Sequence, residues 1–277
     1  MRNIAGKTVV LTGASGGIGV YIARALAKEQ VNLVSISRSQ QGLDRICAEI
    51  KATGSKGISI SFDIQKLEEL PLLVEKITKF AGHIDILINN AAIEKFRSFH
   101  DYSLQDIQSI LTTNLLAAME LTRLVLPSML GRNNGHIVNI ASGSGKKGAP
   151  YNSIYSASKA GLIMWSDAIR QELADTNIGV SAICPGYTDA GMFRALGVSA
   201  PNGMRVAQPT EVANAVLQSI KQNQKEVILD GTSSKIFSAI TQLSPQFGDR
   251  IFRQLGVVNL NQNCAKKQMQ AENIVKN

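Results

Sequence analysis

The chain of 277 residues is long enough for one large α/β domain or two smaller ones, and its 44% hydrophobic and 18% charged residues exclude a disordered protein. A net charge of +8 fits an anionic ligand or a membrane surface, whereas a nucleic-acid partner is not expected, because no nucleic-acid motif is present and only 5% of the residues are aromatic. No apolar run approaches the roughly 20 residues of a membrane span.

The start of the chain and its cysteines bear on the compartment. The first strand pattern begins almost at once, which leaves no room for a cleavable signal. Cys47, Cys184 and Cys264 form neither an even set nor a metal-binding spacing. We therefore expect reduced thiols, a cytoplasmic protein and no metal site.

The first predicted strand, residues 7–12, is a short β-branched run typical of a buried parallel strand. It continues into Thr12-Gly-Ala-Ser-Gly-Gly-Ile-Gly19, and a helical pattern follows. Strand, glycine turn and helix form the context of a dinucleotide site, since glycines allow close backbone approach and a helix N-terminus offers free N–H groups to a pyrophosphate. An ordinary βα turn is the alternative. The expected cofactor contacts in this loop are Gly13, Ser15, Gly17, Ile18 and Gly19.

The second strand, residues 32–37, ends at Ser37 and Arg38. NAD-binding proteins place an acidic residue here on the ribose 2′-hydroxyl. A missing carboxylate together with a guanidinium suits a 2′-phosphate instead, because arginine binds phosphate through a charge-assisted fork. The sequence therefore predicts NADP(H) in preference to NAD(H), with a solvated surface arginine as the alternative.

Two further strands are predicted at residues 57–62 and 84–88, with a crossover helix at 65–81 between them. The third strand ends in Asp63-Ile64, placed for an adenine edge. The fourth runs into Asn89-Asn-Ala-Ala92, where small residues such as Ala91 let a cofactor lie against the backbone near Asn90. This alternation predicts an α/β fold with a doubly wound parallel sheet.

The chemical centre of the sequence is Ser142, which follows the apolar run 136–141, together with Tyr155 and Lys159. A helix from 154 to about 175 would place Tyr155 and Lys159 one turn apart on one face. One charge at about 4 Å supplies about 4 kcal/mol at an effective dielectric of about 20, enough to bring a phenol pKa from about 10 to about 7. The spacing Tyr-x-x-x-Lys alone is common on solvated helices, so the other motifs decide.

Taken in order, these motifs resemble those of the short-chain dehydrogenase/reductase family. Its landmarks run from about residue 7 to 190 and comprise Thr12-Gly-x-x-x-Gly-Ile-Gly19, Asp63, Asn89-Asn-Ala91, Asn114, Ser142, Tyr155-x-x-x-Lys159 and Pro185-Gly186. The resemblance implies a Rossmann-type sheet of about seven strands in the order 3-2-1-4-5-6-7, with the cofactor across the carboxyl ends of the strands.

The resemblance also assigns roles. Tyr155 would exchange the proton with the substrate oxygen, and Ser142 would orient that oxygen, so both would touch the substrate. Lys159 would lower the pKa of the tyrosine and, with Tyr155, bind the nicotinamide ribose, while Asn114 would hold a water that links Lys159 to solvent. Pro185, Gly186 and Thr188 complete the expected cofactor contacts.

Two positions depart from the family pattern. Ala92 replaces a glycine, which is tolerable if its φ is below zero. Ala190 stands where the family often has a threonine, and Thr188, two residues earlier, is the candidate substitute.

Substrate specificity is expected from the segment 187–206, whose apolar residues could form a lid. Lys146 and Lys147 lie near the expected mouth of the cleft, either solvated or facing a remote acidic group of a hydrophobic carbonyl substrate. The segment 104–130 and the helix from 154 suggest the paired-helix surface of a homo-oligomer, a dimer or tetramer.

The C-terminal region departs most from the family pattern. We expect a catalytic NADP(H)-binding domain over residues 1–230 and a helical extension over 231–277 that acts as a lid, an interface or a membrane-facing element. One expected apolar face comprises Ile236, Phe237, Ile240 and Leu243, and a second comprises Phe247, Ile251, Phe252 and Leu255, with Lys235, Arg250 and Arg253 among them. The polar tail from Asn259 is expected to be frayed.

The sequence thus predicts an NADP(H)-dependent oxidoreductase that transfers hydride between the nicotinamide and a carbonyl or alcohol carbon of a hydrophobic small molecule. The alternative is a non-catalytic NADP(H)-sensing or interaction protein on the same fold.

Overall fold

The computed structural model describes residues 3–229, 236 and 239–276. Its centre is a seven-stranded parallel sheet with the strand order β3-β2-β1-β4-β5-β6-β7, which confirms the predicted order. The strands are β1 (Thr8–Thr12), β2 (Asn32–Ser37), β3 (Gly57–Ser61), β4 (Ile86–Asn89), β5 (Gly135–Ile140), β6 (Ile178–Cys184) and β7 (Glu226–Ile228). The reversal of strand order between β1 and β4 creates a crevice at their carboxyl ends, the usual ligand site of such sheets.

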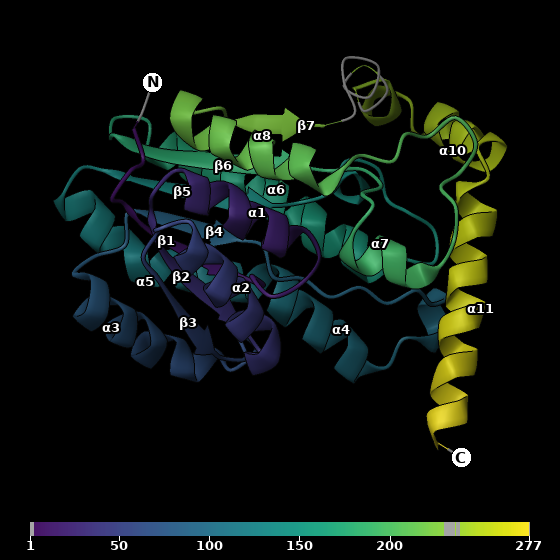
Figure 1. Cartoon of the computed structure of the whole chain (residues 1–277). Coiled ribbons are helices and arrows are strands. Elements are labelled where there is room, and N and C mark those ends of the chain that lie inside the picture. The colour runs from purple at the N-terminus through teal and green to yellow at the C-terminus, as the bar shows by residue number, and fades with distance from the viewer. Residues whose placement is uncertain (1–2, 230–235, 237–238, 277) are drawn as a thin grey trace.

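Helices cover both faces of the sheet (Figure 1). The described α-helices are α1 (Gly17–Lys28), α2 (Gln40–Ala52), α3 (Leu70–Ala81), α4 (Leu104–Leu111), α5 (Ala117–Gly131), α6 (Ser153–Glu172), α7 (Gly191–Leu196), α8 (Pro209–Gln222), α10 (Pro245–Gln254) and α11 (Val257–Lys276). Helices α1, α2 and α8 form one apolar layer with the sheet, and α3, α5 and α6 form the other. Because both faces are buried, the central strands are continuous apolar runs rather than alternating ones.

Local chemistry sets several boundaries. The predicted crossover helix at 65–81 begins as the 3₁₀ turn Leu67–Glu69 and becomes α3 at Leu70, where a proline occupies the first turn. Strand β4 begins at Ile86, two residues later than predicted, and the carboxylate of the preceding Asp85 accepts a hydrogen bond from the Thr8 N–H at 3.0 Å. These shifts leave every predicted element in place.

The long helical segment formed by α4 and α5 is interrupted in its middle. Helices α4 and α5 are joined by a π-helical turn at Thr112–Leu116, a feature frequent at functional sites. By length and composition alone, Leu104–Gly131 is apolar enough to cross a membrane. Within this segment, 44% of the apolar window is buried in the protein, and residues such as Leu121 and Val125 pack in the core.

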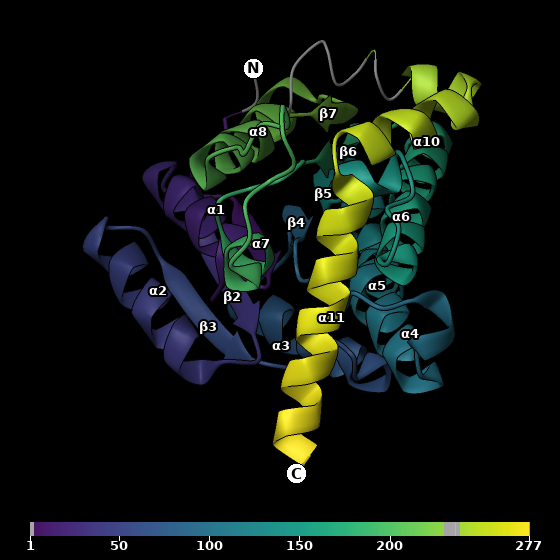
Figure 2. The ribbon, with the colours of Figure 1, turned by 90° about the vertical axis from the view of Figure 1, so that its right-hand side faces the viewer.

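The C-terminal region corrects one expectation. The tail from Asn259, predicted to be frayed, is the 20-residue helix α11, which Figure 2 shows lying across the end of the molecule. Cys264 and Ala265 on this helix are buried against Phe96, so an apolar stripe within a polar sequence anchors it. Lys235 and Phe237 of the preceding segment lie outside the described residues.

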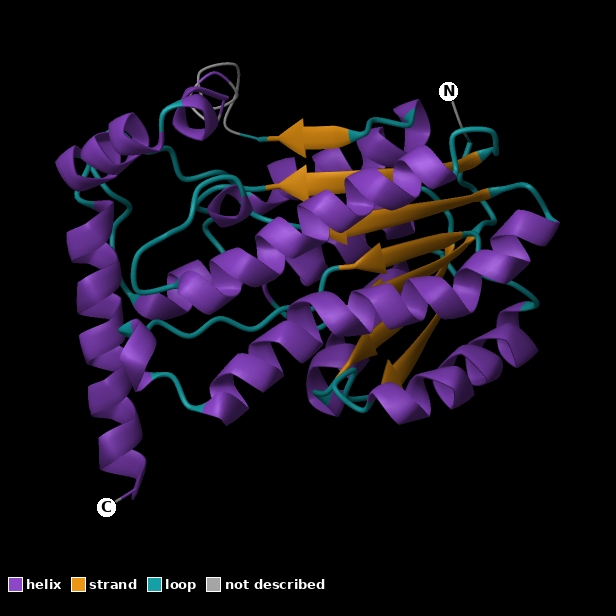
Figure 3. Ribbon diagram, turned by 180° about the vertical axis from the view of Figure 1, so that it is seen from behind, coloured by secondary structure: helices purple, strands orange, loops and turns teal. Residues whose placement is uncertain are grey.

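The strands all point toward the end where α11 lies (Figure 3). The carboxyl ends of the strands are therefore covered on their open side by the C-terminal helix.

Candidate active site

A cavity of about 490 Å³ lies at the carboxyl ends of the strands. It is lined by nearly all of the residues singled out from the sequence, namely Gly13, Ser15, Gly17, Ile18, Ser37, Arg38, Asp63, Ile64, Asn90, Ala91, Ser142, Tyr155, Lys159, Pro185, Gly186 and Thr188. Gly19 and Asn114 are not among the residues that line the cavity. One continuous cavity thus joins the glycine loop to the tyrosine and the lysine.

The glycine loop is shaped by steric necessity. Gly13 has φ +67°, and a Cβ there would lie 2.9 Å from the Ala91 Cα. A Cβ on Gly19 would overlap the carbonyl oxygen of Gly13. These glycines let the loop turn tightly against the end of β4 and leave the N-terminus of α1 open to the cavity, which fits a pyrophosphate.

The ends of β2 and β3 form the adjacent wall. Ser15 and Ser37 join the glycine loop to β2 by a hydrogen bond of 2.5 Å between their hydroxyl groups. Arg38 is exposed at the cavity edge, and within the described chain its guanidinium forms no ion pair. Asp63 uses one carboxylate oxygen to accept the Gln65 N–H at 3.1 Å. A guanidinium without a carboxylate partner, beside Ser37, fits a phosphate on the adenosine ribose.

The end of β4 is held by Thr12. Its hydroxyl accepts the N–H groups of Asn90 and Ala91 at 3.0 and 3.1 Å, and the Asn90 amide donates to the Thr12 carbonyl at 2.9 Å. Ala92 is not among the residues with positive φ, so its methyl group replaces the family's glycine without strain, as the sequence argument required.

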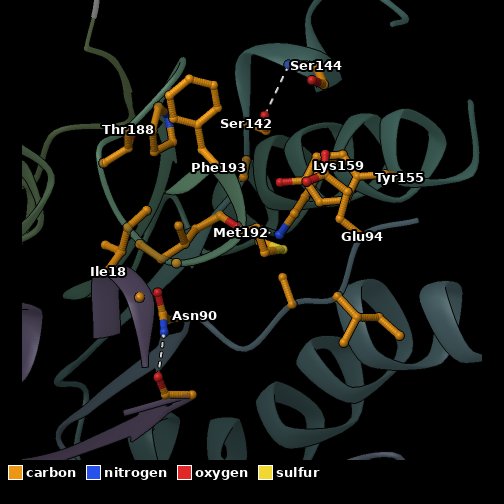
Figure 4. Close-up of a pocket in the computed structure, with 18 of the residues that line it drawn as sticks. Ile18, Asn90, Glu94, Ser142, Ser144, Tyr155, Lys159, Thr188, Met192 and Phe193 are labelled. Atoms are coloured by element: carbon orange, nitrogen blue, oxygen red, sulfur yellow. Dashed lines mark hydrogen bonds between the residues drawn. The ribbon is translucent and has the colours of Figure 1, made fainter. Parts of the chain in front are cut away.

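The catalytic candidates meet at one side of the cavity, where Figure 4 shows Tyr155, Lys159 and Glu94 with Ser142 nearby. Lys159 is 2% exposed; its ammonium donates to the Ile140 carbonyl at 2.8 Å and lies 5.6 Å from the centroid of the Tyr155 ring. The α6 periodicity explains this approach, because both residues sit on one face of the helix.

Asn114 is in the π-helical turn behind Lys159. Its side-chain oxygen accepts the Ile93 N–H at 2.8 Å, and its amide donates to the Ile93 carbonyl and to Ser158 at 2.9 and 3.1 Å. Asn114 therefore locks the chain that follows β4 onto α6. In the structure it is a positioning residue, and its predicted water-holding role stays a prediction.

Burial is the largest influence on the pKa values of Tyr155 and Lys159. Burial raises the pKa of Tyr155, the Glu94 carboxylate raises it further, and a hydrogen bond with Ser142 opposes both. Burial lowers the pKa of Lys159 to about 8, while Glu94 and Cys184 act in the opposite direction. Desolvation thus dominates the pKa of Tyr155 in the polypeptide, and the expectation that Lys159 lowers this pKa stays a prediction.

Thr188 lies in the wall of the cavity, at the start of the predicted lid segment. It is 5% exposed and its hydroxyl donates to the Gly186 carbonyl at 3.3 Å, while Ala190 lies beside it in the cavity wall. Helix α7 of the predicted lid follows, and the rings of Tyr187 and Phe193 stack at 5.0 Å between centroids. The predicted lid carries the apolar residues Met192, Phe193, Leu196, Val198 and Met204, and all of these except Val198 line the cavity.

The fifth lid residue, Val198, packs instead with Tyr151, Leu260 and the α11 residue Cys264. Helix α11 therefore links the lid to the chain after β4. A bond from the Phe96 N–H to Gln268 at 2.8 Å and one from the Asn261 amide to the Pro150 carbonyl at 2.8 Å fix it there.

Ionic contacts hold the far half of α11. The Arg97 guanidinium is 4% exposed in its side chain and lies 2.5 Å from the Glu272 carboxylate, which is also 3.5 Å from Lys95. Lys95 in turn pairs with Asp106 at 2.5 Å. A buried guanidinium depends strongly on its partner, so this cluster fastens the helix over the cavity.

Sequence reasoning missed several cavity residues, namely Glu94, Asn152, Phe252, Val257 and Asn261. Phe252 was assigned to an apolar helix face, which was a usable signal for burial but not for the cavity. Nothing in the sequence around Val257 and Asn261 places them there, because only the return of the tail over the sheet does so.

The two rim lysines are already paired. The Lys146 ammonium lies 2.5 Å from Glu226 and that of Lys147 lies 2.7 Å from Asp249 on α10. They are therefore neither merely solvated nor free to receive an acidic group, and Lys147 helps to attach α10 instead.

Comparison with known proteins agrees with this geometry. The sequence model of the short chain dehydrogenase family matches residues 7–199. The chain belongs to this family. It is therefore an oxidoreductase of a family that uses nicotinamide cofactors.

Two relatives and one solved structure illustrate the range within the family. The ketoacyl reductase HetN of Nostoc sp. is 53% identical over 275 residues, covering 97% of this chain and 96% of HetN. The NADP-dependent 3-hydroxy acid dehydrogenase of Schizosaccharomyces pombe is 30% identical, with coverage of 83% and 93%. The solved structure of a variant of actinorhodin polyketide ketoreductase with NADPH is similar at a TM-score of 0.77 and 30% identity, covering 83% of this chain and 98% of that one.

Proposed function

We propose that the protein uses NADPH to reduce the ketone of a hydrophobic, acyl-type substrate to an alcohol. The observation that carries the proposal is the single cavity that joins the open N-terminus of α1 and Arg38 at one end to Ser142, Tyr155 and Lys159 at the other. The apolar lid over this second end suits an acyl chain. The similarity to two ketoacyl or polyketide reductases supports the choice of substrate.

The protonation state of Tyr155 suits the reducing direction. Because burial raises the pKa of Tyr155, its phenol is protonated at neutral pH and is ready to donate a proton. NADPH, when bound, supplies the hydride to the ketone carbon. Tyr155 donates its proton to the ketone oxygen as negative charge develops there, and the Ser142 hydroxyl orients the same oxygen.

Lys159 contributes charge rather than a proton in this scheme. Its ammonium is anchored on the Ile140 carbonyl and faces the Tyr155 ring, so it stabilises the phenolate left after proton transfer. Gly13, Ser15, Gly17 and Ile18 would hold the pyrophosphate, while Pro185, Gly186 and Thr188 would cover the nicotinamide. Thr188 takes the place of the hydroxyl absent at Ala190.

The preference for NADP(H) rests on Arg38 and Ser37. The guanidinium is free of carboxylate partners in the described structure, and no acidic residue stands at the end of β2. Asp63 and Ile64 would contact the adenine, and Asn90 and Ala91 would contact the adenosine ribose.

The test is NADPH oxidation by the purified protein with a series of 3-ketoacyl thioesters and ketones. We expect turnover, and we expect Tyr155→Phe to lower kcat by about 10²–10⁴-fold while NADPH still binds. Tyr21→Phe, a remote tyrosine beside Arg24, is the control and should change neither quantity. Unchanged turnover of Tyr155→Phe would remove this residue from the mechanism, and NADPH binding without turnover would favour the sensor alternative.

We also propose that the protein is a cytoplasmic homo-oligomer. Leu104, Leu116 and Met164, on or beside α4, α5 and α6, are 69%, 43% and 70% exposed, which suits the expected paired-helix interface. Light scattering should give a dimer or tetramer that Met164→Lys weakens.

A peripheral membrane contact is a separate proposal. Ile240, Leu243 and Phe247 are 40%, 87% and 45% exposed near Arg250 and Arg253, which fits an interfacial surface. Failure to bind anionic vesicles at low salt would rule out this contact.

A further inference from the structure

The catalytic cavity contains a carboxylate for which the reaction above has no use. Glu94 follows β4, is half-buried and lines the cavity. It accepts one hydrogen bond, from the Asn152 amide at 2.5 Å. Within the described chain no lysine, arginine or histidine forms an ion pair with it. A carboxylate in such a position is costly for folding, so its presence needs another reason.

The side chain of its partner Asn152 also lacks the hydrogen bonds expected of a buried polar group. Asn152 is the N-cap residue of α6 and is 2% exposed, yet its side chain makes no capping hydrogen bond. With its amide nitrogen turned to Glu94, its side-chain oxygen has no hydrogen-bond partner among the described atoms. Asparagine at this position ordinarily caps the helix, and buried polar atoms are ordinarily paired. The cavity wall therefore carries two neighbouring acceptors that can take further donors, the unpartnered Asn152 oxygen and the Glu94 carboxylate, which accepts only the Asn152 amide.

These acceptors lie beside the reaction centre. Figure 4 shows Glu94 on the same side of the pocket as Tyr155 and Lys159, across from Met192 and Phe193. Glu94 also interacts electrostatically with both Tyr155 and Lys159. A molecule placed for reduction at Tyr155 would extend past Glu94.

We propose that Glu94 and Asn152 form a substrate-recognition site that binds a hydrogen-bond donor, an amide N–H or a hydroxyl, of a neutral ketone substrate and repels substrates with a free carboxylate. This inference rests on the proposed reductase function and narrows its substrate class. It favours neutral ketoacyl esters or thioesters over free keto or hydroxy acids. The rim offers no compensation for an anion, because Lys146 and Lys147 are paired with Glu226 and Asp249.

The repulsion depends on the charge of Glu94. Burial raises the pKa of this carboxyl to about 7, while Asn152 and Lys159 lower it. The discrimination against anions should therefore strengthen as pH rises through about 7. The titratable groups that interact with Glu94 come from the loop after β4, α6, the loop after β6 and α11, and are Tyr102, Tyr155, Lys159, Tyr187 and Cys264.

The other groups do not produce this pH dependence by themselves. Burial raises the pKa of Tyr102 and Tyr187 to about 12 and also raises that of Cys264, so these three stay neutral near pH 7. Burial keeps Tyr155 protonated at neutral pH, whereas loss of the Lys159 charge as pH rises through about 8 also disfavours an anionic substrate. The contribution of Glu94 is therefore the part of the pH dependence that Glu94→Gln removes.

The test compares three substrates with the same acyl chain. They are a 3-ketoacyl N-acetylcysteamine thioester, which carries an amide N–H, the ethyl thioester, which lacks it, and the free 3-keto acid. For the wild type we expect kcat/KM to fall in that order. Glu94→Gln should reduce the discrimination against the acid by about tenfold or more and remove the part of its pH dependence centred near 7, because the charge is lost while an acceptor remains.

Glu94→Ala should lose the preference for the amide-bearing thioester as well. Glu49→Gln, which removes a carboxylate paired with Arg24 on the far surface, is the control and should behave as the wild type. NADPH affinity, measured by fluorescence, checks that each variant is folded and should be unchanged.

The outcomes separate the inference from the proposal beneath it. If the wild type, Glu94→Gln and Glu94→Ala reduce the three substrates with the same ratios of kcat/KM, the role of Glu94 is overturned. The reductase function would remain supported by that result. NADPH binding without turnover of any of the three substrates would remove the proposed function and the inference together.

Discussion

The two ends of the cavity are built by different means. The cofactor end is made by consecutive βα turns, with Gly13, Ser37 and Asn90 each directly following a strand or ending one. The substrate end is made by residues from five separate segments, 93–96, 142–147, 149–155, 187–204 and 252–261, which meet only in the folded chain. A site built from backbone turns depends on steric space, whereas one built from side chains depends on how distant elements are held. Substitutions should therefore act differently at the two ends.

The largest effect is expected at the glycine loop. In Gly19→Ala the new Cβ would overlap the Gly13 carbonyl oxygen, so the loop must shift. We expect loss of NADPH binding in a fluorescence titration and a free energy of unfolding lower by about 1–3 kcal/mol. Gly131→Ala, where a Cβ meets nothing within 4 Å, is the matched control and should keep both properties. Normal cofactor binding by Gly19→Ala would contradict the steric account of this end.

The next effect concerns the substrate end alone. Glu272→Lys places a positive charge against the buried Arg97 and against Lys95, and because Glu272 is 45% exposed the cost lies between the about 1 kcal/mol of a surface pair and the about 3–5 kcal/mol of a buried one. Helix α11 should open, which would raise the KM for the ketone several-fold and speed hydrogen exchange in α11, with NADPH affinity unchanged. Glu49→Lys, at the exposed pair with Arg24, controls for the charge change. An equal loss of NADPH affinity would show that the two ends are not independent.

A smaller effect distinguishes the two cofactors. Arg38→Ala should weaken NADPH binding about tenfold, because a charge-assisted contact to phosphate is lost, and should leave NADH binding nearly unchanged. The neighbouring exposed Arg45 does not line the cavity, so Arg45→Ala should change neither affinity. Equal losses for both cofactors in Arg38→Ala would make this arginine a bystander.

The smallest effect is on stability as a function of pH. The folded-state pKa of Glu94 is raised to about 7 from 4.5, so the native state holds a proton that the unfolded state releases between these values. The Glu94 contribution therefore lowers the free energy of unfolding progressively from pH 4.5 to 7. Glu94→Gln removes this penalty and should be more stable than the wild type by about 1–2 kcal/mol at pH 8, with a smaller gain at pH 5. Denaturant unfolding at both pH values measures it, and a gain independent of pH would point to packing instead.

Much of the cofactor end could be predicted because its signals are local. A glycine turn between a strand and a helix has few geometries, so Gly13, Gly17 and Gly19 identify the loop without knowledge of distant residues. The same holds for Tyr155 and Lys159, whose spacing on one helix brings them together. Their pKa values were not predictable from the sequence, since desolvation depends on everything packed around the two side chains.

By itself, the sequence determined the alternation of strands and helices and the position of the cofactor loop, because periodicity and turn residues act over a few positions. The strand order and the residues able to do the chemistry came from the family resemblance that the motifs carry. Only the tertiary structure decided that the polar tail is helix α11, that Lys146 and Lys147 are neutralised, and that Glu94 and Asn152 face the substrate end. Each of these depends on contacts between residues far apart in the chain, for which spacing in the sequence carries no signal.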